Sequence, residues 1–373
     1  MSSGFWAVVE KLFSDAGIAI NGNNSWDIKI HNDKVYRRFL AGGSLALGES
    51  YVDGWWDVDK LDDFFYRIFQ TDLADKVKNN WSAISHVMLA KIFNFQNRAR
   101  AFEIGERHYD VDESVYRAML GESMTYTCGY FSAGAGDLDQ AQLAKLDLVC
   151  RKIGLKKGDR VLDIGCGWGS FAKLAAEKYG AEVVGVTVSR NQVEYAKEKY
   201  NGLPIDIRFQ DYRDLNGKFD HIVSLGMFEH VGVKNYRIYM EVVKKCLKKD
   251  GLFLLHTIGG NHSVNSVDPW VNKYIFPNGM LPSIKQIGRS IENLFVMEDW
   301  HNFSADYDKT LMAWHSNFTA NWVKTGENRD QRFIRMWNYY LLSSAASFRA
   351  RRNQLWQVVL SPEGVLGGYK SVR

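Results

Sequence analysis

The sequence lacks any long hydrophobic run, and none of its apolar stretches approaches the ~18 uninterrupted residues that a membrane-spanning helix requires. Cysteine is scarce, and no CxxC pair or Cys/His cluster of the kind that binds zinc occurs. The N-terminus has no basic stretch before its apolar residues, which Glu10 interrupts, so we expect no secretory signal. Together these absences predict a cytosolic protein without a metal site, in which the cysteines are free thiols: Cys128, Cys150, Cys166 and Cys246.

The sequence also lacks a large excess of charge of one sign. The 47 Lys and Arg residues nearly balance the 43 Asp and Glu residues, which leaves a net charge of +4. This surplus is too small and too dispersed to indicate nucleic-acid binding, although it is compatible with an anionic membrane surface. With 46% apolar residues, only 5 prolines and 373 residues, the chain is long enough and apolar enough to fold into about two globular domains.

The first part of the chain, from Phe5 to about Phe95, is rich in helical patterns and aromatic residues. We predict a small helical domain over residues 1–95 that helps to engage lipid at a membrane, followed at 96–122 by a linker and the start of an active-site cover. The crowded aromatic residues allow two interpretations, the core of that domain or a lipid-facing surface, and helical periodicity favours the core. They are Tyr51, Trp55, Trp56, Phe64, Phe65, Tyr66 and Phe69.

From Asp137 onward, apolar strand-like segments alternate with helical ones. Strands are predicted at 160–164, 182–188, 206–209, 219–225 and 251–256, and two more at 295–300 and 355–360. Strands that are apolar on both faces and separated by helices are typical of a parallel sheet covered on both sides. The predicted fold class is therefore α/β, a Rossmann-like domain with a seven-stranded, mostly parallel sheet at 123–373, preceded by the small helical domain.

A glycine-rich turn follows the first strand of this sheet. Glycines there let the backbone approach a ligand closely, and the helix that follows offers free N–H groups. The turn is spaced GxGxG rather than the GxGxxG of dinucleotide sites, and a carboxylate at the strand end suits an amino group better than a pyrophosphate. The pattern predicts S-adenosylmethionine as cofactor, bound by Asp163, Gly165, Cys166, Gly167, Trp168 and Gly169.

Polar residues on or after the next two strands are further candidate cofactor contacts, although such segments are often plain loops or helix caps. On and after the second strand they are Gly185, Thr187, Ser189 and Gln192, and after the third Gln210, Asp211, Tyr212 and Arg213. We expect Asp211 to accept a hydrogen bond from the adenine amino group and Tyr212 to pack on the ring. Glu229 follows the fourth strand and His256 ends the fifth, at the edge where open α/β sheets bind ligands.

Four segments together resemble the cyclopropane fatty acid synthases: Val161–Gly169, Gly226–Gly232, His256–Gly259 and the extended run VDPWVNKYIFP at 267–277. The similarity spans nearly the whole chain, including GESYVDGWW at 48–56. It implies transfer of a methylene group from S-adenosylmethionine to the cis double bond of an unsaturated acyl chain in a membrane phospholipid. The alternative is a methyltransferase that acts on an acyl chain or a small lipophilic molecule without forming a ring.

The resemblance also implies an active-site bicarbonate as the base, held by Cys128, Glu229, His256, Ile258 through its backbone, and Tyr307. Tyr126 and Thr127 match further cofactor positions. The family pattern implies a homodimer that works as a peripheral protein at the inner face of the cell membrane. Three arginines near the end of the chain, within Phe348–Arg352, either contact a phosphate headgroup or complement a helix C-terminus.

Overall fold

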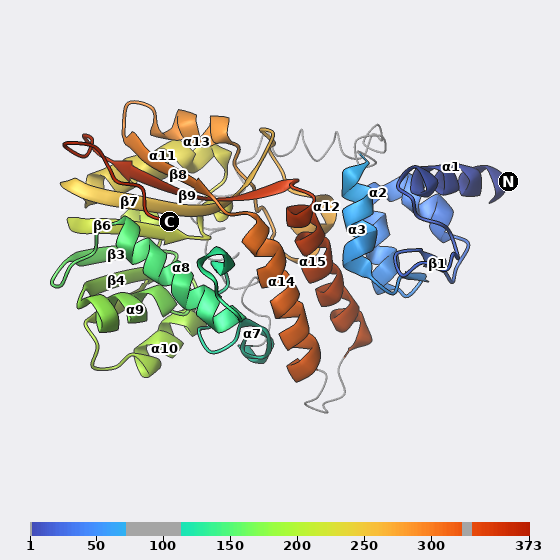
Figure 1. Ribbon diagram of the computed structural model, residues 1–373, viewed down its shortest axis with the longest axis horizontal. Helices are drawn as coiled ribbons and strands as arrows, with labels where there is room; N and C mark the ends of the chain where they lie inside the picture. The colour runs from blue at the N-terminus through green and yellow to red at the C-terminus, as the bar shows by residue number, and fades with distance from the viewer. Residues whose placement is uncertain (1, 72–112, 323–329) are drawn as a thin grey trace. The chain divides into compact units, whose positions relative to one another are not determined.

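The computed structural model describes residues 2–71, 113–322 and 330–373, which form two compact units (Figure 1). The first unit combines the described residues up to position 93 with 265–277 and 308–353, and the second contains the rest. Each unit therefore joins segments that are distant in sequence. The contiguous division at 95 and 122 stays a prediction, and residues 96–112 lie outside the described residues.

The second unit contains a seven-stranded sheet, which confirms the predicted fold class. In sheet order its strands are β5 (Ile205–Phe209), β4 (Glu182–Thr187), β3 (Arg160–Ile164), β6 (Phe219–Leu225), β7 (Leu247–Gly260), β9 (Asn353–Ser361) and β8 (Val296–Asn302). The pairs from β5 to β7 are parallel, whereas β8 and β9 are antiparallel. All seven strands lie within a few residues of their predicted positions, because most contain a short apolar run. β7 extends beyond its apolar run at both ends, and β8 is largely polar.

Helices cover both faces of this sheet, so that it lies in the middle of three layers (Figure 1). On one face, α8 (Leu138–Lys152), α9 (Ser170–Tyr179) and α10 (Arg190–Lys199) enclose one apolar cluster. On the other, α11 (Tyr236–Cys246) and α13 (Ile284–Ile291) enclose a second. Helix α7 (Glu113–Leu120) precedes them in the chain. Asp137 starts α8 as an N-cap, with its carboxylate accepting from the backbone N–H of Gln140 at 2.8 Å.

The first unit is helical, with α1 (Ser2–Asp15), α2 (Val35–Val52), α3 (Leu61–Gln70), α12 (Pro269–Tyr274), most of α14 (Ala305–Asn317) and α15 (Gln331–Arg349). A small ladder pairs β1 (Lys29–Ile30) with β2 (Trp56–Asp57). Helix α15 packs on α2 and α3. Tyr51, Trp56, Phe64 and Phe65 are buried there, which confirms the core interpretation for these four aromatic residues.

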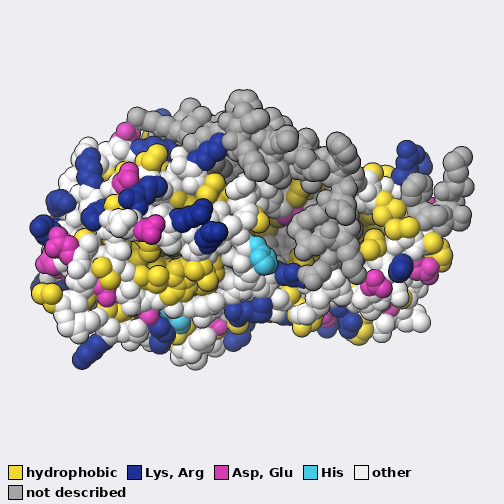
Figure 2. Space-filling view, turned by 90° about the horizontal axis from the view of Figure 1, so that it is seen from above, with side chains coloured by type: hydrophobic (Ala, Val, Ile, Leu, Met, Phe, Trp, Pro, Cys, Tyr) yellow, Lys and Arg dark blue, Asp and Glu magenta, His cyan; other side chains and the backbone are white. Residues whose placement is uncertain are grey.

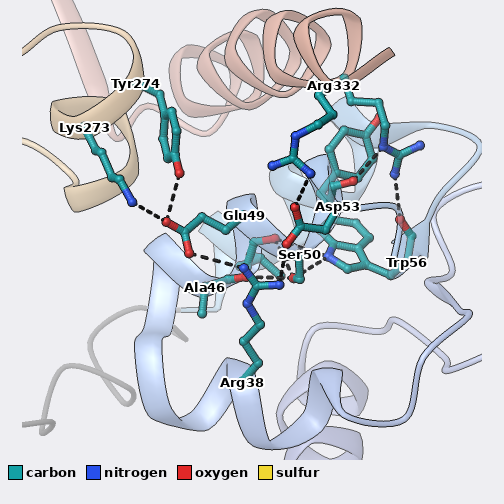
Figure 3. Close-up of polar contacts among 12 residues, drawn as sticks. Arg38, Ala46, Glu49, Ser50, Asp53, Trp56, Lys273, Tyr274 and Arg332 are labelled. Atoms are coloured by element: carbon teal, nitrogen blue, oxygen red, sulfur yellow. Dashed lines mark hydrogen bonds and ion pairs between the residues drawn. The ribbon is translucent and has the colours of Figure 1, made fainter. Parts of the chain in front are cut away.

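Two sequence motifs that lie more than 200 positions apart meet in this unit (Figure 3). Glu49 of the GESYVDGWW segment accepts from Lys273 Nζ at 2.7 Å and from the Tyr274 hydroxyl at 2.9 Å. Gly48 lies so close to Trp270 that an added Cβ would come within 2.3 Å of the indole Cδ1. The VDPWVNKYIFP run thus forms α12 and docks on α2, a contact that its sequence pattern alone did not predict.

The basic segment at the end of α15 has a third role, which neither sequence interpretation included. The guanidinium of Arg349 contacts the carboxylates of Asp62, Asp63 and Asp308 at 2.9–3.1 Å. These contacts raise its pKa further and leave its positive charge neutralised within the unit. Arg349 therefore ties α15 to α3 and α14.

Among the described helices, none is both long and apolar enough to cross a membrane.

Candidate active site

The ends of four neighbouring strands bring the candidate residues to one edge of the sheet. Asp163 is the penultimate residue of β3, Thr187 ends β4, and Gly226 follows β6. His256 of β7 pairs in register with Leu225 of β6, and its carbonyl accepts from the N–H of Gly226 at 2.9 Å. Because β4, β3, β6 and β7 are adjacent, the predicted convergence of these strand ends is what the topology produces.

The glycine loop after β3 requires glycine at three alternate positions. Gly165, Gly167 and Gly169 have φ angles of 81°, 55° and 85°, in the left-handed region that side chains disfavour. A Cβ at Gly165 would lie 2.5 Å from that of Met227, whereas a Cβ at Gly167 would meet no atom within 4 Å. The loop therefore exposes backbone to open space just before α9, which fits the approach of a cofactor.

Trp168 and Asp163 flank this loop from the buried side. Trp168 packs edge-on or tilted against Tyr116 and Tyr195, at centroid distances of 6.2 and 5.2 Å. Asp163 is buried, and its Oδ1 has no hydrogen-bond partner. Burial raises the pKa of Asp163 to about 7, although the positive charge of Lys145 acts in the opposite direction. An unpartnered carboxylate oxygen beside the loop fits the amino group of S-adenosylmethionine.

The candidates after β4 hydrogen-bond to one another. The hydroxyl of Thr187 donates to Gln192 Oε1 at 2.7 Å, and Ser189 caps α10 by accepting from the N–H of Gln192. A Cβ at Gly185 would clash with Cys166 and Ile207, so glycine there lets the sheet approach the loop. These contacts explain the residue types locally, and their contacts with the cofactor remain predictions.

The candidates after β5 are likewise engaged with their neighbours. Asp211 accepts from the backbone and the guanidinium of Arg213 at 2.9 and 2.8 Å. Tyr212 is buried with its ring 5.0 Å from that of Tyr239, and Gln210 Nε2 donates to the carbonyl of Asp214. Desolvation raises the pKa of Tyr212 to about 12. The predicted packing of Tyr212 on an adenine ring and the acceptor role of Asp211 stay predictions.

Glu229 and His256 each present one free polar atom in this buried region. Glu229 lies in the short helix η3 (Phe228–His230), where its Oε1 accepts from the N–H of Ile258 at 2.6 Å. Its Oε2 is buried without a partner, and so is Nε2 of His256. Burial raises the pKa of Glu229 to about 7, despite the opposing hydrogen bond from Ile258. Burial and nearby lysine charges hold the pKa of His256 well below its usual range, so its imidazole is neutral.

The contact between His256 and Gln357 bears on which ring nitrogen of the histidine carries the proton. The amide Nε2 of Gln357 lies 3.3 Å from His256 Nδ1. With the Gln357 amide assigned in this orientation its nitrogen donates, and the matching tautomer of His256 accepts at Nδ1 and carries the ring proton on Nε2. The site thus offers one buried acceptor, Glu229 Oε2, and one buried donor, His256 Nε2–H. An acceptor and a donor of this kind would suit a small oxyanion with one O–H group, such as bicarbonate, which donates through that group and accepts through its other oxygens.

Cys128 belongs to a segment that α8 holds in place. It is buried, and its thiol donates to the carbonyl of Gly129 at 3.1 Å. Neighbouring Thr127 is contacted by two side chains of α8, Gln142 and Lys145. Tyr126 is half-buried with its ring 5.3 Å from that of Tyr116. Tyr307 is buried in the first turn of α14, and its approach to the other anion-site candidates stays a prediction.

Sequence reasoning missed the polar residues that α8 buries. Gln142, Lys145 and Lys152 are essentially inaccessible to solvent. They recur at helical spacing together with Leu138, Ala141 and Val149 on the buried face of the helix. That shared periodicity indicates in the sequence that these residues lie on the buried face of the helix. A lysine at such a position is nevertheless expected to be solvated until the tertiary contacts are known.

Comparison with known proteins gives consistent results. Residues 96–358 match the protein family described as mycolic acid cyclopropane synthetase. The chain is 50% identical over 369 residues to the cyclopropane-fatty-acyl-phospholipid synthase of Escherichia coli (strain K12), an alignment covering 99% of this chain and 96% of that protein. A probable fatty acid methyltransferase of Pseudomonas putida is 36% identical over 264 residues, which cover 68% of this chain and 67% of that protein.

Among solved structures, the mycolic acid cyclopropane synthase CmaA1, complexed with SAH and CTAB, is similar with a TM-score of 0.64 and 30% sequence identity. The match covers 69% of this chain and 97% of that one.

Proposed function

The chain belongs to the cyclopropane synthase family, as the sequence motifs predicted, and on that premise we propose a bicarbonate-assisted reaction at a membrane surface. The enzyme transfers a methylene group from S-adenosylmethionine to the double bond of an unsaturated phospholipid acyl chain and forms a cyclopropane ring. The identity of the base, the residues that hold it, the membrane association and the oligomeric state are our proposals.

The chemistry needs three contributions from the protein. An alkene is a weak nucleophile, so the sulfonium methyl and the double bond must be held in line and away from water. Methyl transfer leaves a carbocation on the acyl chain, which aromatic faces such as that of Tyr126 stabilise. A proton must then leave the new methyl group before the ring closes.

Bicarbonate, when bound, supplies the base for that proton. Glu229 Oε2 would accept its O–H group, and the Nε2–H of His256 would donate to one of its oxygens. The backbone of Ile258 orients Glu229 for this task through its short hydrogen bond. Cys128 and Tyr307 complete the proposed anion site. The observation that supports this proposal is the pair of buried, unpartnered and complementary polar atoms on Glu229 and His256.

The test is product analysis with vesicles of unsaturated phospholipid, S-adenosylmethionine and CO₂-depleted buffer, with and without added bicarbonate. The molecular masses of the lipids are measured by mass spectrometry, before and after mild catalytic hydrogenation. We expect a gain of one CH₂ with loss of hydrogen uptake, and a rate that depends on bicarbonate. A rate that stays full in its absence would refute the proposed base. Glu229→Gln should lower the rate about 100-fold or more, as expected for loss of acid–base function.

One relative supports a second candidate function, which is methylation without ring formation. The Pseudomonas putida protein is named a probable fatty acid methyltransferase and aligns with 68% of this chain. The hydrogenation step separates the two activities. A product heavier by CH₂ that still takes up hydrogen would retain the double bond and would support simple methylation instead.

We propose that the enzyme is cytoplasmic and peripheral on the inner face of the membrane, with α1 among the elements that engage lipid. Trp6 and Val8 of that helix are 42% and 49% exposed. Figure 2 also shows hydrophobic side chains exposed among Lys and Arg side chains over one face of the second unit. Such mixed surfaces favour anionic lipid interfaces.

Vesicle co-sedimentation tests this lipid contact with the double variant Trp6→Ser/Val8→Ser. Leu143→Ser, at another exposed apolar position, is the control. Undiminished binding of the double variant would contradict the role of α1. The proposed homodimer is tested by light scattering of the intact protein, and a mass of one chain at working concentration would exclude it.

A further inference from the structure

Lys145 is a buried lysine beside the candidate site, and neither the sequence motifs nor the proposed function assigns it a role. Burial lowers its pKa to about 7, so nearby negative charge determines how far the amine is protonated at neutral pH. Its side chain is fully buried within α8, where lysine is rarely found without a partner. Its Nζ donates to Thr127 Oγ1 at 2.8 Å. The ammonium is thereby fixed beside the residue that precedes Cys128.

Helix α8 holds this segment at several points, which makes the position of Lys145 well defined. Gln142 Nε2 donates to the carbonyl of Thr127 at 2.7 Å, and the N–H of Tyr130 donates to the carbonyl of Ala141 at 2.8 Å. A Cβ at Gly129 would lie 2.9 Å from that of Ala141. The chain on both sides of Cys128 therefore lies directly against α8.

The charge of Lys145 reaches three groups of the site. Its positive charge lowers the pKa of Asp163 and that of His256, and it interacts electrostatically with Cys128. Glu229 contributes no positive charge, and His256 is neutral. Lys152 also acts on His256, but Lys145 is the lysine that acts on Asp163, Cys128 and His256 together. A positive charge on Lys145 would offset a small anion buried among these groups, and an uncompensated buried charge is strongly unfavourable.

We propose that Lys145 is a positioning residue of the anion site, which fixes Thr127 and Cys128 through its hydrogen bond and supplies the positive charge that offsets a bound bicarbonate. This inference rests on the proposed role of bicarbonate. A purely structural alternative is that Lys145 compensates only Asp163. The two differ in one measurable respect, because the alternative predicts no effect of Lys145 on the response to bicarbonate.

Two variants separate the two contributions of the side chain. Lys145→Met removes both the charge and the hydrogen bond at similar length, whereas Lys145→Gln removes the charge and keeps a donor. Lys152→Met is the matched control, because Lys152 is a second buried lysine of α8 whose Nζ instead meets His301 Nδ1 at 3.0 Å and Asp299 at 3.6 Å.

The first readout is independent of turnover. The midpoint of thermal unfolding is measured in CO₂-depleted buffer against added sodium bicarbonate, with sodium chloride at equal ionic strength as reference, and yields the apparent bicarbonate affinity. The second readout is the affinity for S-adenosylhomocysteine by calorimetry, which reports an intact cofactor site. The third is the bicarbonate concentration that gives half-maximal product formation.

We expect both Lys145 variants to bind bicarbonate on the order of tenfold more weakly, as for loss of a charged hydrogen-bonding partner, with S-adenosylhomocysteine affinity changed less. Lys152→Met removes a charge that acts on His256 but not on Asp163 or Cys128, and it should weaken bicarbonate binding less than Lys145→Met does. If Lys145→Gln binds bicarbonate as tightly as the wild type, the charge of Lys145 has no role. If Lys145→Met also binds it as tightly, the whole proposal is wrong. If Lys145→Met fails to fold, the bicarbonate affinity of Lys145→Gln alone tests the proposal. If the wild-type enzyme forms its product without any response to bicarbonate, the base assignment fails together with this inference, whereas the transferase activity stands.

Discussion

Replacing Glu229 by glutamine should remove a specific pH dependence from the stability of the protein. The carboxyl group is buried, with one oxygen bonded to the N–H of Ile258 and the other without a partner. Burial raises its pKa from 4.5 to about 7. At 1.36 kcal/mol per pH unit, this difference of about 2.5 units corresponds to about 3 kcal/mol.

The sign of the effect follows from proton binding. Between pH 4.5 and about 7 the folded state holds a proton on Glu229 that the unfolded state has lost. The contribution of the protonated carboxyl to stability is therefore complete below pH 4.5 and is lost as the pH rises through about 7. Glutamine cannot ionise, so Glu229→Gln should be more stable relative to wild type at pH 8 than at pH 5. The difference is about 2.5 kcal/mol, because pH 5 already lies above the unfolded-state pKa of 4.5.

The measurement is urea unfolding of both ligand-free proteins at a series of pH values in CO₂-depleted buffer. Other titrating groups, including Asp163 and Lys145, are common to both proteins and cancel in the difference. Glu182→Gln, at an exposed position, is the control and should give a curve parallel to wild type. Parallel curves for Glu229→Gln would refute the reasoning, because they would mean that Glu229 is ionised equally in the folded and unfolded states.

Two further predictions concern glycines that permit close packing. Gly48→Ala places a Cβ 2.3 Å from Trp270 and should lower the free energy of unfolding by about 1–3 kcal/mol in urea titrations. Gly288→Ala, a helical position with no neighbour within 4 Å, should be neutral or stabilising, and equal effects of the two would contradict the packing argument. Gly165→Ala combines a φ of 81° with a clash against Met227, and should weaken S-adenosylhomocysteine binding in calorimetry about tenfold or more. Unchanged affinity would show that the loop is not the cofactor cradle.

The sequence predicted the sheet and the edge at which the candidate residues gather, because both depend on local patterns. Most strands contain a short apolar run, and the glycines after β3 mark a turn that other residues rarely adopt. Parallel strands bring their carboxyl ends to one edge, so Asp163, Glu229 and His256 were predictable as neighbours. The family motifs added the proposed anion site. Glu229 and His256 support it as buried groups with one unpartnered atom each, whereas the roles of Cys128 and Tyr307 stay predictions.

Other features could not be predicted, because they depend on contacts between residues far apart in the chain. Helical periodicity placed Lys145 on the same face as Ala141, but only the packing of α8 on the segment around Thr127 shows that the lysine is buried at the site. The docking of Trp270 against Gly48 is of the same kind.

The amino-acid sequence by itself therefore determined the fold class, the glycine loop and the family, since these follow from short-range periodicity, backbone freedom and motif spacing. Only the tertiary structure decided which charges are buried and which partners they have. Arg349 illustrates the reason: its three carboxylates come from residues 62, 63 and 308, and a side chain's desolvation and ion pairs are set by everything that packs around it.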